Sequence, residues 1–437
     1  MKAFNTMQQK VVQEASKSLD STKKALIYMA TGTGKTETAI KLLQKRGYEK
    51  VLWLTHQDEL AKQSFERFNK LGVFDTSIYS GQIKDSSGAV VVATIQTISK
   101  IKHLSRFSKS QFDAIVVDEC HHAPAATWEK TIKHFECDRI GLTATPFRPD
   151  NKYEKIFDVF GQPVGNISFD LAVKNKFLAK PVSSLILTDS VIKGFTNVNK
   201  ELTSFQLDKL YSSMERNKII VKAYQEEGRN VLLAKKIKPK AVVFCINVAH
   251  ARLMADLFQT NGLSAAFVCG DSAQQSAFER ELIMTKFRTS DKIELICAVN
   301  IFNEGVDIPE ANICMMLRPT GSNIIYQQQV GRVARNNGGK KKFFIVLDFV
   351  DNCTKGFSTY MSTNLTKGGS QGVKVVFKYL RDPDSIAVKK RVEDLMLKVR
   401  EFEASMWRSV EVNKQNAKDH LDALKEGKVL VFKKRMT

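Results

Sequence analysis

Ten short apolar runs, arranged as two sets of five, constrain the fold of this chain more than any other feature of its sequence. The first set comprises Ala25–Met29, Val51–Thr55, Ala89–Thr94, Ala114–Asp118 and Arg139–Thr145, and the second comprises Ala241–Cys245, Ser264–Gly270, Glu294–Val299, Asn312–Leu317 and Phe343–Phe349. Apolar runs of this length, separated by helical stretches, are typical of parallel strands covered on both faces. The pattern predicts an α/β protein with two tandem doubly wound parallel-sheet domains.

The rest of the chain is divided by these two sets. We expect a first domain over residues 1–150, a connector insertion of mixed α/β structure over 151–240, a second domain over 241–351, and a basic loop with a helical C-terminal region over 352–437. Within the connector, the sequence predicts a strand at PVSSLILTD and mostly helix from Ser204 to Lys236. A tail helix is expected after Pro383, with an apolar seam from Val388 to Met406.

Charge indicates the kind of partner. Of the 437 residues, 67 are Lys or Arg and 46 are Asp or Glu, which gives a formal net charge of +21. A balance this basic favours a polyanionic partner, although a generally basic soluble protein stays open.

The cysteines form no C-x-x-C pair, so we expect neither zinc nor a disulfide framework. No run is long enough to span a bilayer, and we expect a cytoplasmic protein with no membrane partner.

A glycine-rich turn follows the first apolar run. Gly32 and Gly34 precede Lys35 and Thr36, and a helical stretch begins directly after them. Met29 stands where the general phosphate-binding loop has its first glycine. The glycines let backbone N–H groups face phosphate oxygens at a helix N-terminus. Lys35 would reach the β- and γ-phosphates of ATP and the Thr36 hydroxyl would bind Mg²⁺.

Two adjacent carboxylates end another run of the first set. Asp118 and Glu119 follow AIVV and are expected at the carboxyl edge of the sheet. There Asp118 can hold Mg²⁺, and Glu119 can orient and deprotonate the attacking water. An ordinary charged turn after a strand is the alternative interpretation.

Five short motifs occur in a fixed order along residues 1–350. They are ATGTGKT from Ala30, DECH from Asp118 to His121, TAT from Thr143 to Thr145, EGVD from Glu304 to Asp307, and QQVGRVAR from Gln328 to Arg335. In this order they resemble motifs I, II, III, V and VI of the superfamily 2 DExH helicases and translocases. That family has two RecA-like domains, and its own version of the loop needs no glycine at Met29.

The resemblance implies roles for individual residues. ATP would be bound by Gln8, Thr31, Gly32, Thr33, Gly34, Lys35, Thr36 and Asp307, with Gln9 as an open alternative to Gln8, and Mg²⁺ by Thr36 and Asp118. Catalysis is assigned to Lys35, Glu119, Gln328, Arg332 and Arg335. Nucleic acid would be contacted by Thr55, His56, Thr94 and Gln96, while His121, Thr143, Thr145, Glu304 and Gly305 would couple the two sites. His121 could instead be an ordinary loop histidine.

The arginines of the last motif explain why two domains are needed. Arg332 and Arg335 lie three residues apart, so they share one face of a helix. From the second domain they can reach across a cleft to the γ-phosphate held by the first. An arginine supplied in this way stabilises the charge of the transition state.

The motifs indicate the type of nucleic acid less sharply. RPTGSNIIYQQQVGRVAR is similar to the RecG, RadD and UvsW type, and only Val306 to Asn323 separates motif V from the helix of motif VI. This short spacing favours a duplex translocase or branch-migrating enzyme over a long-range unwinder. We expect an ATP-driven DNA helicase or translocase that acts on branched DNA in replication, recombination or repair. We further expect a monomeric motor and a bacterial or phage-infected cell as its source. An RNA helicase, a nucleotide-gated RNA-binding ATPase and a restriction-type translocase subunit stay open. The region from Asn336 to Arg381 holds eight basic and two acidic residues, and is either a phosphate contact or a solvated loop.

Overall fold

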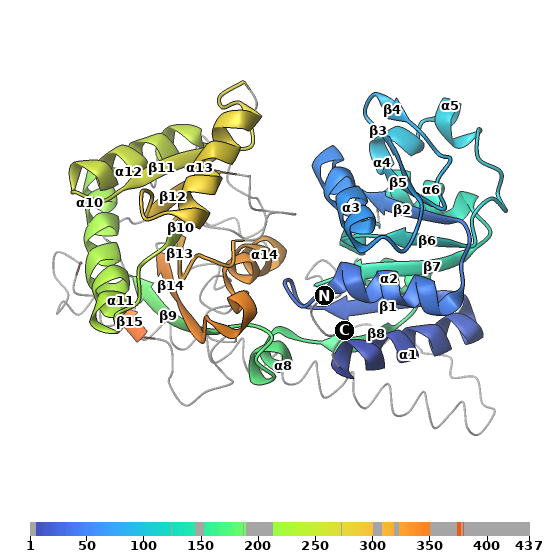
Figure 1. Cartoon of the computed structure of the whole chain (residues 1–437), viewed down its shortest axis with the longest axis horizontal. Helices are drawn as coiled ribbons and strands as arrows, with labels where there is room; N and C mark the ends of the chain where they lie inside the picture. The colour runs from blue at the N-terminus through green and yellow to red at the C-terminus, as the bar shows by residue number, and fades with distance from the viewer. Residues whose placement is uncertain are drawn as a thin grey trace, which may run out of the picture.

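The structure is a computed structural model, and it describes residues 6–123, 125–144, 153–186, 188, 213–271, 273–299, 308–318, 323–349, 374–376 and 379. These residues form two α/β units, each built around its own sheet, lying side by side (Figure 1). Within the described ranges no helix is long and apolar enough to cross a membrane.

The first unit contains an eight-stranded sheet in the order β4-β3-β5-β2-β6-β7-β1-β8. All neighbours are parallel except β3 and β4, which form an antiparallel pair. The strands are β1 (Lys24–Met29), β2 (Val51–Thr55), β3 (Thr76–Ser80), β4 (Ile83–Lys84), β5 (Val90–Thr94), β6 (Ala114–Val117), β7 (Asp138–Thr143) and β8 (Pro163–Ile167). The helices are α1 (Thr6–Thr22), α2 (Lys35–Arg46), α3 (Asp58–Leu71), α4 (Ile95–Ile98), α5 (Ile101–Leu104), α6 (Ala126–His134) and α7 (Tyr153–Phe160), with a 3₁₀ turn at Cys120–His122.

The second unit contains a seven-stranded sheet in the order β11-β12-β10-β13-β14-β9-β15, parallel throughout. Its strands are β9 (Lys180–Ile186), β10 (Ala241–Phe244), β11 (Ala265–Cys269), β12 (Leu295–Val299), β13 (Ile313–Met316), β14 (Phe343–Phe349) and β15 (Lys374–Val376). The helices are α8 (Phe169–Lys174), α10 (Met214–Ala223), α11 (Asn230–Ala234), α12 (Val248–Thr260), α13 (Ala277–Thr289) and α14 (Asn323–Val333), with a π-helical turn at Tyr224–Arg229 and a 3₁₀ turn at Asn337–Gly339.

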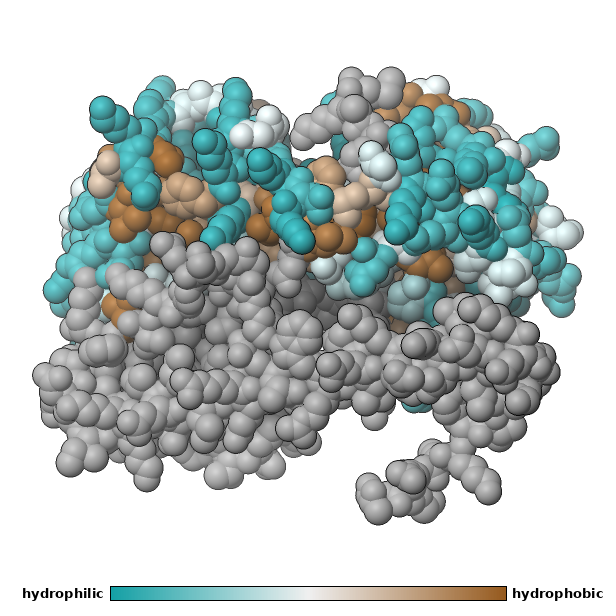
Figure 2. Space-filling model, turned by 90° about the horizontal axis from the view of Figure 1, so that it is seen from below, coloured by the Kyte–Doolittle hydropathy of each residue, from teal (hydrophilic) through white to brown (hydrophobic). Residues whose placement is uncertain are grey.

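The central strands are buried on both faces, as their unbroken apolar runs predicted. All five residues of β2 are buried, and they alternate between two cores. Val51 and Trp53 pack into the core on one face of the sheet, while Leu52 and Leu54 pack into the core on the other. Seen from below, polar side chains cover much of the outer surface of both units, with apolar residues between them (Figure 2). Each of the ten predicted strands is present, and the two-domain fold is confirmed.

The segment expected to be a separate connector, 151–240, contributes a strand to each sheet. β8 pairs with β1 in the first unit, and β9 pairs with β14 in the second (Figure 1). Seven residues of β9 are in register with seven of β14, so the second sheet begins at Lys180 rather than at 241. The described part of Ser204–Lys236 is helical, as predicted. The predicted tail helix after Pro383 lies outside the described residues.

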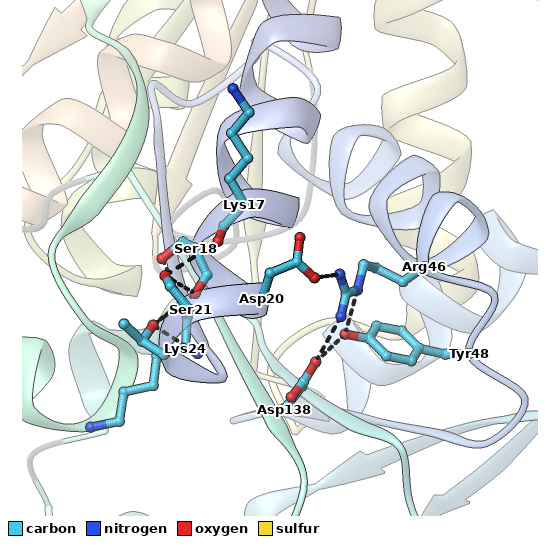
Figure 3. Close-up of polar contacts among 9 residues, drawn as sticks. Lys17, Ser18, Asp20, Ser21, Lys24, Arg46, Tyr48 and Asp138 are labelled. Atoms are coloured by element: carbon cyan, nitrogen blue, oxygen red, sulfur yellow. Dashed lines mark hydrogen bonds and ion pairs between the residues drawn. The ribbon is translucent and has the colours of Figure 1, made fainter.

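A polar cluster fixes the N-terminal helix to the first sheet. Arg46, at the end of α2, pairs with Asp20 of α1 and lies 3.7 Å from the carboxylate of Asp138 in β7 (Figure 3). Tyr48 donates a hydrogen bond to the same carboxylate. Burial, together with that bond, raises the pKa of Tyr48. The cluster joins α1, α2 and β7, and so fixes where the other end of α1 lies.

Candidate active site

The glycine-rich loop joins β1 to α2. Gly32 and Gly34 have φ angles of +84° and +85°, a region that glycine adopts without strain. The Thr33 amide and hydroxyl both donate to the Ala30 carbonyl, at 3.2 Å and 2.6 Å. The loop is therefore a tight turn at the N-terminus of α2, where phosphate is favoured by the helix dipole.

Helix α1 supplies a further contact to this loop. Gln8 Nε2 donates to the Thr33 carbonyl at 3.0 Å. A Cβ atom added at Gly34 would lie 2.5 Å from the same nitrogen, so a larger residue there would displace the Gln8 amide. Gln9 is exposed. The structure thus favours Gln8 over Gln9 as the residue that lies beside the nucleotide loop.

The two carboxylates lie at the carboxyl end of β6. Glu119 has a φ of +49°, and its amide donates to Asp118 Oδ1 at 3.0 Å. Lys35 Nζ lies 3.3 Å from Glu119 Oε1, and His121 Nδ1 lies 3.4 Å from Glu119 Oε2. Burial opposes the ionisation of Glu119, but Lys35, His121 and Arg332 outweigh it and hold the pKa of this carboxyl well below its usual range.

This ion pair bears on how Glu119 could act as a base. A phosphate group at the loop would compete with Glu119 for the Lys35 ammonium, because a phosphate carries more charge than a carboxylate. Losing Lys35 as a partner would raise the pKa of Glu119 towards the usual range. We therefore expect the proton affinity of the base to increase as nucleotide binds.

The second unit completes the site. A cavity of about 390 Å³ is lined by Gly32, Lys35, Thr36, Asp118 and Glu119 from the first unit and by Arg332 and Arg335 from the second. A Cβ atom on Gly331 would lie 2.8 Å from Thr31 Cβ, and one on Gly32 would lie 3.2 Å from Arg335 Cγ. Helix α14 thus rests directly on the phosphate loop. The prediction that both arginines lie on one helical face is wrong, because α14 ends at Val333 and Arg335 lies beyond it, in a β-bridge with Leu178.

The oxygen donors on one wall of the cavity suit magnesium. The Thr36 hydroxyl and the Asp118 carboxylate both line it. Mg²⁺ prefers oxygen ligands and is commonly held by one or two carboxylates together with substrate phosphates. When bound, the ion would neutralise charge that develops on the phosphates.

Helix α3 lines the cavity as well, and the sequence interpretation missed it. Gln63, Arg67 and Lys70 face the same space. Arg67 pairs with Glu37 in the first turn of α2. Steps of four and three residues place all three side chains on one helical face, and this signal could have identified them.

The residues expected at the nucleic acid differ in exposure. Thr55 and Thr94 are only 0% and 1% exposed. Thr55 donates to the Gln57 carbonyl, and Thr94 to the Thr97 hydroxyl, so their side chains cap local turns instead of facing outwards. Gln96 is exposed, and its amide donates to the His56 carbonyl.

Three histidine rings connect these residues to the carboxylates. The His121 and His122 rings lie 4.2 Å apart, and the His122 and His56 rings 4.7 Å apart. His122 was not predicted from the sequence. Since His121 contacts Glu119, packed rings extend from the ATP cavity to the segment that carries His56.

The remaining predicted residues are placed less completely. Thr143 is buried at the end of β7, and Gln328 is buried one turn before Arg332. Thr145, Glu304, Gly305 and Asp307 lie outside the described residues.

Comparison with known proteins agrees with this geometry. Residues 1–148 match the family described as "Type III restriction enzyme, res subunit", and residues 225–337 match the "Helicase conserved C-terminal domain". The chain carries the paired motor domains of the superfamily 2 helicases. Members of this superfamily use ATP with Mg²⁺.

Several curated proteins are similar over most of this chain. An ATP-dependent helicase of Saccharomyces cerevisiae, IRC3, is 26% identical over 351 residues, which are 75% of this chain and 48% of that protein. The type I restriction enzyme EcoKI endonuclease subunit of Escherichia coli is 25% identical over 71% of this chain and 31% of its own length. DNA 3'-5' translocase XPB2 of Sulfurisphaera tokodaii is 26% identical over 79% of this chain and 81% of its own. This chain thus spans about half of the first relative and a third of the second.

Solved structures share the fold. A fragment of an HsdR subunit of a type I restriction enzyme from Vibrio vulnificus has a TM-score of 0.61 at 23% identity, covering 80% of this chain and 65% of that one. The type ISP restriction-modification enzyme LlaBIII bound to DNA has a TM-score of 0.67 at 16% identity, covering 91% of this chain and 33% of that one. At these identities the likeness concerns the fold alone.

Substitutions at Lys35 and Glu119 should separate binding from hydrolysis. We expect Lys35→Ala to abolish ATP hydrolysis in a folded protein, because the phosphates lose their main side-chain cation. Glu119→Gln should still bind ATP with Mg²⁺ but stall before hydrolysis, because the amide cannot accept the proton. Turnover and nucleotide titration, with thermal melting as the control for folding, check both. Near-normal turnover in Lys35→Ala, or lost nucleotide binding in Glu119→Gln, would contradict these roles.

A methyl group at Gly331 should act at the junction of the two units. Gly331→Ala places a Cβ atom against Thr31, so α14 must shift by a fraction of an ångström or more. We expect kcat to fall by roughly 10- to 100-fold, since small misplacements of catalytic groups can cost about this much. ATP affinity and melting temperature should change little, because the substitution alters neither the phosphate-loop residues nor the strands of either sheet. Unchanged kcat would show that this contact does not set the position of the arginines.

Proposed function

We propose that the protein is an ATP-driven DNA translocase or helicase that acts on duplex and branched DNA in replication, recombination or repair. The cavity shared by two units carries the proposal. Its phosphate loop and carboxylates come from one unit and its arginines from the other, so hydrolysis depends on how the two units meet. If both units hold the same nucleic acid, each cycle of closing and opening becomes a step along it.

The relatives and the sequence support DNA as the substrate. One similar protein is named as a DNA 3'-5' translocase and another as a subunit of a restriction endonuclease. The motif VI region resembles the RecG, RadD and UvsW type. Between Val306 and Asn323 the structure describes β13 within a short connection, which leaves little space for a strand-separating hairpin. These features favour movement on duplex or branched DNA over long-range unwinding.

A basic surface on the first unit is suited to phosphates. We define the α5 patch as Lys100, Lys102 and Arg106, which are all exposed. No acidic residue occurs between Ile95 and Phe112. Burial first, and then Lys84 and the three cations of the patch, lower the pKa of His103, so these charges lie within electrostatic reach of one ring. The patch follows α4, which contacts α5 and carries Gln96.

The other basic region expected from the sequence is only partly suited to this role. Lys340 and Lys342 are exposed, but the ammonium group of Lys341 points inwards to backbone carbonyls. A run of three lysines therefore presents two charges to solvent here. The part of this region from 350 to 373 lies outside the described residues.

A panel of ATPase assays tests the proposed function. We expect turnover to rise most with duplex DNA or a four-way junction, less with single-stranded DNA and least with RNA. Lys35→Ala, measured in parallel, defines the background of contaminating ATPases. Greatest stimulation by RNA would favour the RNA helicase alternative. Stimulation by duplex without any unwinding or branch migration would favour a restriction-type translocase subunit.

Neutralising the α5 patch should change the salt dependence of DNA binding. The triple variant Lys100→Ala, Lys102→Ala, Arg106→Ala should lower the slope of log affinity against log salt by up to about 0.9 for each phosphate that the patch no longer neutralises. Basal ATPase should stay unchanged, because the patch does not line the cavity. The matched control is Lys17→Ala, Lys41→Ala, Lys45→Ala, which removes three exposed charges from α1 and α2. Equal slopes in the two triple variants would remove the patch from the binding surface.

A further inference from the structure

Lys341 has an unusual set of partners for a lysine within a basic run. Its Nζ donates to the carbonyls of Pro309 at 2.9 Å, Ala311 at 2.7 Å and Val333. An ammonium group has three hydrogens, and here each has an acceptor. The neighbouring lysines are exposed, so this inward orientation belongs to Lys341 alone among the three.

The three carbonyls come from two segments, and one of these is the helix whose Arg332 lines the ATP cavity. Val333 is the last residue of α14, directly after Arg332 and two residues before Arg335. The last carbonyls of a helix lack partners within it, and a cation there is favoured by the helix dipole. Pro309 and Ala311 lie in the connection that leads into β13. Lys341 therefore caps α14 and ties its end to that connection.

A tight turn brings Lys341 back under the helix. Asn336 accepts bonds from the amides of Gly339 and Lys341, at 3.3 Å through its side chain and 2.9 Å through its carbonyl. Gly338 and Gly339 have φ angles of +70° and +91°. The turn reverses the chain between α14 and β14, so Lys341 comes back to the Val333 carbonyl at the end of the helix.

The surroundings of the ammonium group are mostly uncharged. Burial lowers the pKa of Lys341 to about 7. The Glu310 carboxylate and the Cys314 thiol act in the opposite direction and raise this pKa, but burial has the larger effect. Glu310 lies between the two accepting carbonyls, and Cys314 lies in β13. Neutral lysine has two hydrogens to donate, so deprotonation would leave one carbonyl without its bond.

We propose that Lys341 is a positioning residue for ATP hydrolysis: by binding the end of α14 and the connection at Pro309–Ala311 together, it fixes Arg332 and Arg335 at the cavity. The inference rests on the proposed ATPase function. It assigns Lys341 a role apart from nucleic-acid binding, whereas its exposed neighbours are free to contact phosphates.

Replacing each lysine of the run in turn tests this role. Lys341→Met keeps most of the stem and removes the three donors, and Lys340→Met and Lys342→Met make the same charge change at exposed sites. We expect kcat of Lys341→Met to fall by roughly 10- to 100-fold, with KM for ATP within about twofold, because the arginines act on transition-state charge. The salt slope of DNA binding should stay that of the wild type. Both controls should keep wild-type kcat.

Lys341→Met with wild-type kcat would overturn the inference, and so would an equal loss in either control. If Lys341→Met fails to fold, the inference is tested by the pH dependence of kcat in the wild type and in Lys341→Arg. The wild type should lose activity as pH rises through about 7, whereas Lys341→Arg, which stays charged, should lack that decline. Identical profiles would overturn the inference. A wild type without ATPase activity would instead overturn the proposed function itself.

Discussion

The close approach of α14 to the phosphate loop is the contact on which the rest of the site depends. Gly331 leaves room for Thr31, and Gly32 leaves room for the Arg335 stem. The segment between α8 and β9 contacts the same junction, because the Ala179 amide donates to the Ala334 carbonyl at 2.6 Å. Helix α14 therefore contacts the loop and carries Arg332, and the residues directly after it carry Arg335 and bind Ala179, so a change in any of these contacts affects the others.

Electrostatics in the cavity follow from this arrangement. The loop provides Lys35 and the helix provides Arg332, and both cations act on the Glu119 carboxylate at the end of β6. Because these two cations come from different units, separating the units weakens the hold on Glu119. Packed histidine rings connect the same carboxylate to His56. The proposed catalytic carboxylate and a residue proposed to contact nucleic acid are thus joined by one set of packed side chains.

Much of the fold was predictable because parallel strands that are buried on both faces need unbroken apolar runs, and the sequence holds ten of them in two sets. The residues of the phosphate loop and the two arginines were predictable from motif order. Other features depend on hydrogen-bond partners that the sequence pattern does not reveal. β9 belongs to the second sheet because it pairs with β14. The hydroxyls of Thr55 and Thr94 are buried because they donate hydrogen bonds within local turns. The inward ammonium of Lys341 depends on a turn that the sequence pattern did not reveal.

The position of β9 in the second sheet also affects how the chain folds during translation. The first sheet is complete once β8 has been synthesised, at Ile167, because its partner β1 already exists. β9 follows immediately, but it pairs with β14, which ends at Phe349, and with β15, which ends at Val376. On the ribosome the edges of this strand therefore stay unpaired until β14 and β15 have been synthesised. Open strand edges invite pairing with other chains, so the nascent protein passes through a period in which it is most prone to aggregate.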